Sequence, residues 1–321
     1  MTPVASAAKP GKKERKATLA HRVEYYAMRG TIEALRALSW HRAGAIGEKL
    51  GELGYRPLGI RKRVVESQIA AAFPELSPAR VVSLARESYR HLGRSSIETA
   101  LLGSIGRDGL QRLVETVEGW DLIEEVMARG KGAVLVTGHI GNWELAGAYV
   151  AARGVPLDAI VRGMANPLFD TWLNRTREEM GMTVVHDSEA VRRTPRSLRA
   201  GRAVAFVADQ GVLGLASTFV PFFGRPAKTP RGAAVFALRF EVPVLFVVAL
   251  RQPNGRYRIV VERVEIAGTG DKDKDVDAIV TRYTQLLEKW VRVVPAQYFW
   301  QHRRWRRQPP DTPSELRDPS A

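Results

Sequence analysis

From residue 131 onward, the apolar and polar positions follow two alternating patterns. Short apolar runs rich in valine, isoleucine and alanine predict buried strands, and the amphipathic segments between them predict helices. This alternation predicts an α/β fold with a mostly parallel central sheet flanked by helices. The expected strands are 133–136, 157–161, 182–185, 203–208, 244–250 and 257–264, and the expected helices are 142–150, 167–180, 189–200, 230–240 and 275–291.

The first 130 residues have mainly helical spacing, and residues 19–55 are amphipathic. Apolar residues such as Leu19 and Tyr26 recur at helical steps, while arginines repeat every seven residues from Arg22 to Arg36 on another face. This pattern is typical of a helix that lies in a membrane surface, and it equally fits a surface helix docked on the core. Further helices are expected at 60–72, from Ser77-Pro78 to about 102, and at 120–129.

These patterns divide the chain into four expected segments. A flexible basic tail comes first, and an N-terminal helical, membrane-associating region packs on the core. The α/β core follows, and a second flexible tail ends the chain. The expected bounds are 1–18, 19–118, 119–308 and 309–321.

The charge of the chain indicates an anionic partner. The 321 residues carry a formal net charge of +15, which suits nucleic acid, an acidic membrane surface, a phosphorylated substrate or an acidic carrier protein. The absence of cysteine excludes disulfides, thiol nucleophiles and cysteine metal sites. No run of 18 uncharged apolar residues occurs, and the N-terminus lacks the apolar segment of a signal peptide, so we expect neither a spanning helix nor a signal peptide.

The turn after the first core strand contains the strongest candidate for chemistry. His139 falls in this turn, at the strand end where open α/β sheets bind ligands, and Glu144 falls in the first turn of the following helix. A carboxylate on one imidazole nitrogen would leave the other nitrogen as a general base. The backbone amides near Gly141 to Trp143 are candidates for an oxyanion site. The alternative is a buried histidine bonded to a helix-capping carboxylate.

Two other predicted strands also end in polar residues. Arg162 follows one strand and is suited to bind phosphate, although an ion pair with a nearby acid explains it as well. Asp209-Gln210 follows another strand, where Asp209 would orient a substrate group or cap the loop. Arg225 and Lys228 add positive charge in a long loop. No motif with metal-ligand spacing is present, so we expect no metal and no bound cofactor.

Taken together, these motifs resemble those of the bacterial lipid A biosynthesis (late) acyltransferases, part of the glycerolipid and lysophospholipid acyltransferase superfamily. The resemblance covers about residues 19–308 and rests on six motifs in register. They are Phe73-Pro-Glu-Leu76, Gly138-His-Ile-Gly-Asn-Trp-Glu144, Val161-Arg162 with Asn166-Pro-Leu168, Asp209-Gln210, Phe219-Val-Pro-Phe-Phe-Gly224, and Gln297-Tyr-x-Trp-x-His-Arg-Arg304.

The resemblance implies an enzyme at the cytoplasmic face of the inner membrane, attached peripherally because residues 19–55 are interrupted by charges. It would move a fatty acyl chain from acyl carrier protein or acyl-CoA to a hydroxyl of a lipid A precursor or similar glycolipid. His139 would be the base and Glu144 would orient it. Substrate-binding roles are expected for Asn142, Arg162, Asp209, Gln210, Arg225 and Lys228.

Three other readings of the sequence remain open. The acceptor could instead be a lysophospholipid, an amino-lipid or a mannosylated lipid. The arginines and aromatics of residues 298–307 also fit a basic nucleic-acid-binding protein, although that reading does not explain His139 and Glu144, and we expect no nucleic-acid partner. The third reading is a catalytically silent scaffold that only binds lipid.

Overall fold

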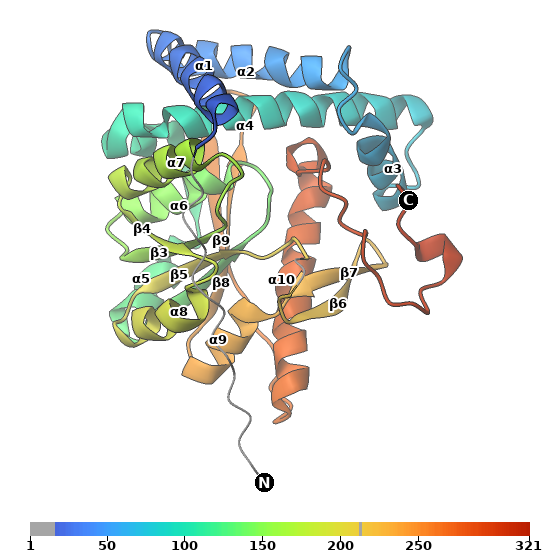
Figure 1. Cartoon of the computed structure of the whole chain (residues 1–321). Helices are drawn as coiled ribbons and strands as arrows, with labels where there is room; N and C mark the ends of the chain where they lie inside the picture. The colour runs from blue at the N-terminus through green and yellow to red at the C-terminus, as the bar shows by residue number, and fades with distance from the viewer. Residues whose placement is uncertain (1–16, 212–213) are drawn as a thin grey trace.

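The computed structural model of the protein describes residues 17–211 and 214–321, and its centre is a seven-stranded sheet in the order β1-β9-β8-β2-β5-β3-β4 (Figure 1). Neighbouring strands are parallel except for the antiparallel pair β8 and β9. The sheet strands are β1 (Val114–Glu118), β2 (Ala133–Thr137), β3 (Leu157–Val161), β4 (Met182–His186), β5 (Ala203–Val207), β8 (Val244–Arg251) and β9 (Tyr257–Arg263). The expectation of a mostly parallel sheet flanked by helices is confirmed.

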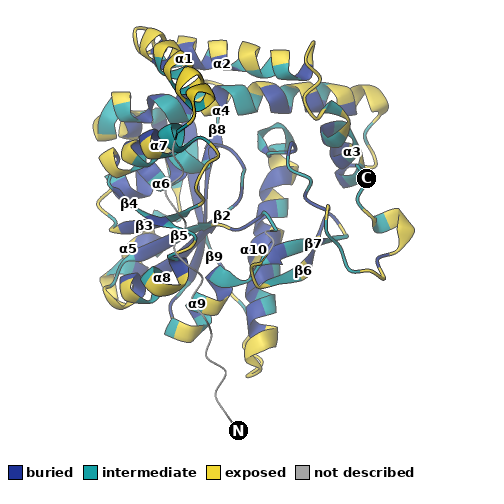
Figure 2. Ribbon diagram, in the orientation of Figure 1, coloured by how far each residue is buried: buried dark blue, intermediate teal, exposed yellow. Residues whose placement is uncertain are grey.

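The central strands are apolar because both faces of the sheet are covered. In β2, Val134 and Val136 pack in one core cluster, and Ala133 and Leu135 pack in the other. Helices α8 (Ala190–Arg199), α9 (Gly232–Phe240) and α10 (Lys272–Val293) contribute to the first cluster, and α5 (Trp120–Ala128) and α6 (Trp143–Ala152) contribute to the second. Figure 2 shows the buried strands between these helices.

The N-terminal helices form a separate layer along one side of the sheet (Figure 1). Ser77 caps α4 with Pro78 in its first turn, as predicted, but α4 continues eleven residues further than the expected end at 102, through a break at Gly106. The remaining helices are α1 (Leu19–Arg36), α2 (Trp40–Tyr55), α3 (Lys62–Ala72), α4 (Pro78–Leu113), α7 (Pro167–Glu179), and the short η1 (Pro295–Gln297) and η2 (Ser314–Leu316).

Two strand assignments differ from the sequence prediction. The expected long loop with Arg225 and Lys228 is a hairpin of β6 (Ser217–Phe222) and β7 (Arg225–Pro230). Strand β1 was not predicted, because its sequence contains two glutamates and only its first residue is buried. β1 pairs with β9, so the sheet begins before the expected domain border at 118/119.

The tails were expected to be flexible. Residues 1–16 of the N-terminal segment lie outside the described residues. The C-terminal segment, 309–321, instead folds back on the protein, where Asp318 binds Arg303 and the Arg317 carbonyl accepts a hydrogen bond from Arg225. Within the described residues, no helix combines the length and apolar character that crossing a bilayer requires.

Candidate active site

His139 lies in the turn between β2 and α6 and points toward the end of the neighbouring strand. Its Nδ1 atom is 2.6 Å from Oδ1 of Asp209, and its backbone N–H donates to Oδ2 of the same carboxylate at 2.9 Å. The register of the two parallel strands explains this contact: Thr137 pairs with Val207, and His139 and Asp209 each lie two residues further on. The imidazole is partly exposed, with 20% of its side chain accessible.

The Asp209 carboxylate is ionised although it is buried. Burial opposes its ionisation, but the charge and hydrogen bonds of His139 outweigh burial and lower the pKa of Asp209 to about 2. An ionised carboxylate only accepts hydrogen bonds, so Nδ1 of His139 carries the proton and donates it. Nε2 of His139 is thereby left with a free lone pair, as a general base requires.

The expected contact between Glu144 and His139 is not formed in the part of the chain that the structure describes. Both carboxylate oxygens of Glu144 bind Arg177 on α7, at 2.9 Å to Nε and 2.5 Å to Nη2. Arg177 is further held by Asn174 at 2.6 Å. A guanidinium offers a planar fork that matches both oxygens, which a single imidazole nitrogen cannot do. Asp209 therefore occupies the position on His139 that the sequence suggested for Glu144.

Hydrogen bonds within the protein fix the backbone of the His139 turn. They use two of the amides that were expected to bind an oxyanion. The N–H of Gly141 donates to the Gln297 carbonyl and that of Asn142 to the Ala249 carbonyl, each at 2.9 Å. These two amides are therefore occupied within the protein. Gly141 has φ of +61°, and a Cβ there would lie 2.0 Å from the Ala249 carbonyl oxygen, so only glycine fits.

A buried polar network supports the same turn from α4 and β8. The Gly141 carbonyl can only accept a hydrogen bond, so Nε2 of His91, 3.0 Å away, carries the proton. Nδ1 of His91 then accepts from Arg251 at 2.6 Å, and Arg251 also binds Glu98 and Tyr257. Burial and the neighbouring Arg251 lower the pKa of His91 well below its ordinary value, which keeps the ring neutral.

Aromatic side chains enclose the imidazole of His139. The Trp143 ring lies edge-on with its centroid 4.8 Å away, and the Phe299 ring lies at 5.8 Å. The Phe299 N–H donates to the His139 carbonyl at 2.9 Å, which ties residues near 299 to the turn. These rings limit the access of water and leave an apolar surface beside the base.

Two residues of the C-terminal motif lie close to Asp209. Burial and the nearby Asp209, partly through a hydrogen bond, raise the pKa of Tyr298 well above its ordinary value. His302 is largely buried, which lowers its pKa to about 4, while the Asp209 charge opposes this and the His139 charge adds to it. His302 is therefore neutral near pH 7.

The other residues predicted from strand ends lie along the same edge of the sheet. Gln210 places its Nε2 3.2 Å from Nδ1 of His139. Arg162 follows β3, two strands from β2, or about 10 Å across the sheet. Its side chain is 63% exposed, and the only ion pair recorded for it within residues 17–211 and 214–321 is a loose one of 3.7 Å to Asp187.

Three predicted substrate-binding residues make internal contacts instead. Asn142 is buried, and its side-chain oxygen caps the N-terminus of α6. Arg225 donates to the Arg317 carbonyl at 3.0 Å. Lys228 lies on β7, where its carbonyl accepts from Arg304 at 2.7 Å. The contacts of Asn142 and Arg225 are structural, whereas the contact of Lys228 involves its backbone and leaves the predicted role of its side chain a prediction. Among the described residues, none of the three side chains has a hydrogen bond or ion pair with His139.

The sequence reasoning missed several residues of the site. Arg177 is 33 positions from Glu144, and no local pattern marks it as the partner. Tyr298 and His302 belong to the C-terminal motif, but the chain neighbours of His302 include no partner at a spacing that would predict a catalytic role. The motif itself was the available signal, since the 298–302 segment reaches the site through the fold.

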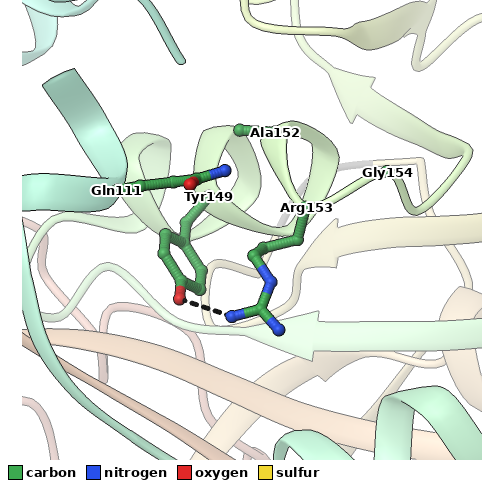
Figure 3. Close-up of a pocket in the computed structure, with 5 residues that line it drawn as sticks. All are labelled: Gln111, Tyr149, Ala152, Arg153 and Gly154. Atoms are coloured by element: carbon green, nitrogen blue, oxygen red, sulfur yellow. Dashed lines mark hydrogen bonds between the residues drawn. The ribbon is translucent and has the colours of Figure 1, made fainter. Parts of the chain in front are cut away.

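A surface hollow of about 500 Å³ lies elsewhere, at the C-terminal end of α6 (Figure 3). It is lined by Tyr149 and Arg153, which are joined by a hydrogen bond of 3.1 Å. The ten residues of α6 separate it from the His139 turn by about 15 Å. Among the residues described, no group of three or more side chains suited to hold a metal ion is found.

Comparison with known proteins identifies the family of this chain. Residues 12–307 match the family described as bacterial lipid A biosynthesis acyltransferase. The chain is 27% identical over 274 residues to the lipid A biosynthesis lauroyltransferase of Escherichia coli (strain K12), covering 84% of this chain and 87% of the relative. It is 25% identical over 266 residues to the lipid A biosynthesis palmitoleoyltransferase of the same strain, covering 82% of this chain and 85% of the relative. A phosphatidylinositol mannoside acyltransferase of Mycobacterium tuberculosis (strain ATCC 25618 / H37Rv) is 29% identical over 195 residues. This match covers 59% of this chain and 60% of the relative.

Proposed function

Because this chain belongs to the bacterial lipid A biosynthesis acyltransferase family and is an O-acyltransferase, we propose that it acylates a hydroxyl of a lipid A precursor or a similar glycolipid. The acyl donor is acyl carrier protein or acyl-CoA, both of which carry the chain as a thioester. The observation that supports this mechanism is the hydrogen bond between His139 Nδ1 and the buried Asp209 carboxylate.

In the proposed reaction His139 Nε2 takes the proton of the acceptor hydroxyl as its oxygen attacks the thioester carbonyl. The new C–O bond forms, the C–S bond breaks, and the imidazolium returns the proton to the departing thiolate. Asp209 keeps the tautomer and stabilises the imidazolium between these steps. No acyl-enzyme is required, in keeping with a chain that contains no cysteine.

Glu144 acts in this proposal as a positioning residue rather than as the partner of the base. Its pair with Arg177 fixes the first turn of α6 against α7. Because the His139 turn leads directly into α6, this pair holds Trp143 and the base in place.

Arg162 is the proposed contact for an acceptor phosphate. Its guanidinium is exposed at the same sheet edge as His139 and can bind phosphate oxygens with two parallel hydrogen bonds. A phosphorylated glycolipid acceptor would thus span from Arg162 to the base. The similarity to a phosphatidylinositol mannoside acyltransferase supports a mannosylated lipid as a second candidate acceptor.

We propose peripheral attachment at the cytoplasmic face of the inner membrane through α1. Leu19, Val23 and Tyr26 lie at positions i, i+4 and i+7 of α1 and are exposed, whereas Ile32 and Leu35 dock on the protein. An exposed apolar stripe flanked by arginines suits the boundary between headgroups and acyl chains of an anionic leaflet. Replacing the three exposed residues with aspartate should reduce co-sedimentation with anionic vesicles.

A transfer assay tests the proposed function. Purified wild type and His139→Ala are incubated with labelled acyl carrier protein or acyl-CoA and a lipid A precursor, and the lipids are examined by mass spectrometry. A mass gain of one acyl chain with the wild type alone supports the proposal. An equal gain with His139→Ala, at an unchanged melting temperature, overturns the assignment of the base. If the wild type gives no gain, the same assay on mannosylated and lysophospholipid acceptors tests the alternatives.

A further inference from the structure

Helix α2 carries three large aliphatic side chains on the face that points away from the protein, while Tyr55 and Trp40 at its ends pack inward. The three aliphatic residues are exposed and follow the spacing i, i+4 and i+7: Ile46, Leu50 and Leu53. The opposite face packs on α4 through glycines, since a Cβ at Gly47 would lie 2.7 Å from the Gly93 carbonyl and one at Gly51 2.0 Å from the Tyr89 carbonyl. A helix on the surface of a water-soluble protein shows the reverse arrangement, with its apolar stripe facing the core.

The segment after α2 continues this apolar surface. Leu58 is 66% exposed and Ile60 is 56% exposed. In Figure 1 the connection between α2 and α3 rises on the same side of the molecule as α1 and α2, and Figure 2 shows exposed residues along all three. Residues 56–63 are here called the basic loop. Four cations flank its two apolar residues: Arg56, Arg61, Lys62 and Arg63.

We propose that the outer stripe of α2 and the basic loop insert together into the surface of an anionic bilayer, an inference that rests on the proposed function. Isolated exposed apolar residues are common, but five of them on one side of the molecule, joined to a cluster of positive charge, match the two components of interfacial binding. The apolar side chains enter the acyl boundary, and the exposed Arg56 and Arg63 meet lipid phosphates. This surface extends the proposed attachment beyond α1.

The basic loop is also bonded to the wall of the active site. Nη1 of Arg61 donates to the Gln301 carbonyl at 2.8 Å, and Gln68 of α3 donates to the carbonyls of Trp300 at 2.7 Å and His302 at 2.8 Å. These three acceptors directly follow Phe299, whose ring stands beside His139. The inserted loop thus holds the segment that lines the base.

The test compares Leu58→Asp/Ile60→Asp with wild type and with a control, Val191→Asp, which places one of these two charges at a 78% exposed valine on α8. Vesicles of phosphatidylethanolamine and phosphatidylglycerol are sedimented with each protein. The double variant should bind at least about tenfold more weakly, and Val191→Asp should bind as wild type does. Transfer to an acceptor embedded in these vesicles should fall in parallel, while transfer to the acceptor in detergent micelles should stay within about twofold.

Other outcomes overturn the proposal in distinguishable ways. Wild-type vesicle binding by the double variant removes the membrane role of the basic loop. An equal loss of transfer in vesicles and micelles shows a damaged site rather than lost attachment. Self-association of the wild type that the double variant abolishes, with vesicle binding unchanged, assigns this face to a second copy of the chain. If no acceptor is acylated but binding still depends on Leu58 and Ile60, the proposed function fails and the membrane surface stands.

Discussion

Nδ1 of His139 and Oδ1 of Asp209 lie 2.6 Å apart although the two residues are 70 positions apart in the sequence. The contact depends on the pairing of β2 with β5, which places the two strand ends side by side. The carboxylate also accepts the backbone N–H of His139, so it fixes the ring and the turn together.

Asp209→Asn should lower kcat by about 10² to 10⁴-fold, because an amide no longer selects the tautomer with a free Nε2. KM for the acceptor should change little, since Asp209 is buried behind the base. Steady-state kinetics check this, with Asp311→Asn, at an exposed position of the C-terminal segment, as the control. A kcat within about threefold of wild type would contradict the pairing.

Glu144→Gln should destabilise the fold by about 1–3 kcal/mol, because it leaves the partly buried Arg177 without its charged partner. The double variant Glu144→Gln/Arg177→Met removes both charges and should recover part of this loss. Urea unfolding measures the free energy of unfolding for each variant. If Glu144→Gln abolishes turnover at unchanged stability, Glu144 acts on the substrate or the base directly.

Gly141→Ala should reduce both stability and kcat, and Gly154→Ala provides its matched control. Both glycines have positive φ, so either substitution adds about 1–2 kcal/mol of backbone strain. Only at Gly141 would the new Cβ also strike a carbonyl and displace the His139 turn, because nothing lies within 4 Å at Gly154. We expect kcat to fall at least about tenfold for Gly141→Ala and to be unchanged for Gly154→Ala. Equal kinetics in the two variants would show that the turn tolerates displacement.

The free energy of unfolding should fall as the pH drops from about 6.5 to about 4. In this range His302 binds a proton in the unfolded chain but stays neutral in the folded protein. The pKa difference corresponds to at most about 3 kcal/mol. Urea unfolding between pH 7.5 and 4 should therefore show a shallower pH dependence for His302→Asn than for wild type. Asp209 adds a separate loss at lower pH, between its ordinary pKa of 3.8 and about 2, where the folded carboxylate becomes protonated. An identical slope in His302→Asn and wild type would contradict the first contribution.

Arg162→Ala should raise KM for a phosphorylated acceptor about tenfold with a smaller effect on kcat, because the exposed guanidinium contacts ground state and transition state alike. Arg225→Ala should leave KM unchanged, since that side chain is bonded to the C-terminal segment. The two variants are compared on the same acceptor with and without its phosphate. A rise in KM for Arg225→Ala alone would move the phosphate site to the hairpin.

The sequence predicted the parts of the fold that depend on local periodicity. The predicted apolar strands and the helices between them are confirmed. A strand buried on both faces is an apolar run, and a helix buried on one face has apolar residues at helical spacing, so both can be recognised locally. The β6–β7 hairpin is not predictable from its sequence pattern, since its prolines at 221, 226 and 230 are unusual in strands. Strand β1 was not predicted because only its first residue is buried, so its sequence lacks the apolar run that indicates a core strand.

The site was predicted in part because strand ends can be located but pairings between them cannot. His139, Asp209 and Arg162 were all expected at one edge of the sheet, and the structure brings them there. The partner of His139 could not be read from the sequence, because it depends on which strand lies next to β2. Glu144 was chosen for its nearness along the chain, whereas Arg177 reaches it from a helix that the sequence does not place.

The β2–β5 register sets the pairing of His139 with Asp209, so this pairing does not depend on the lengths of the outer loops in the chain segment between them. This segment contains α6, β3, α7, β4 and α8. It begins at the end of β2, and the chain then returns to the neighbouring strand β5. Insertions or exchanges within its outer loops would reshape the acceptor side while the base and its carboxylate stay in register. Substitutions in these outer loops are therefore a route to a changed acceptor selectivity that leaves the pairing of His139 with Asp209 intact.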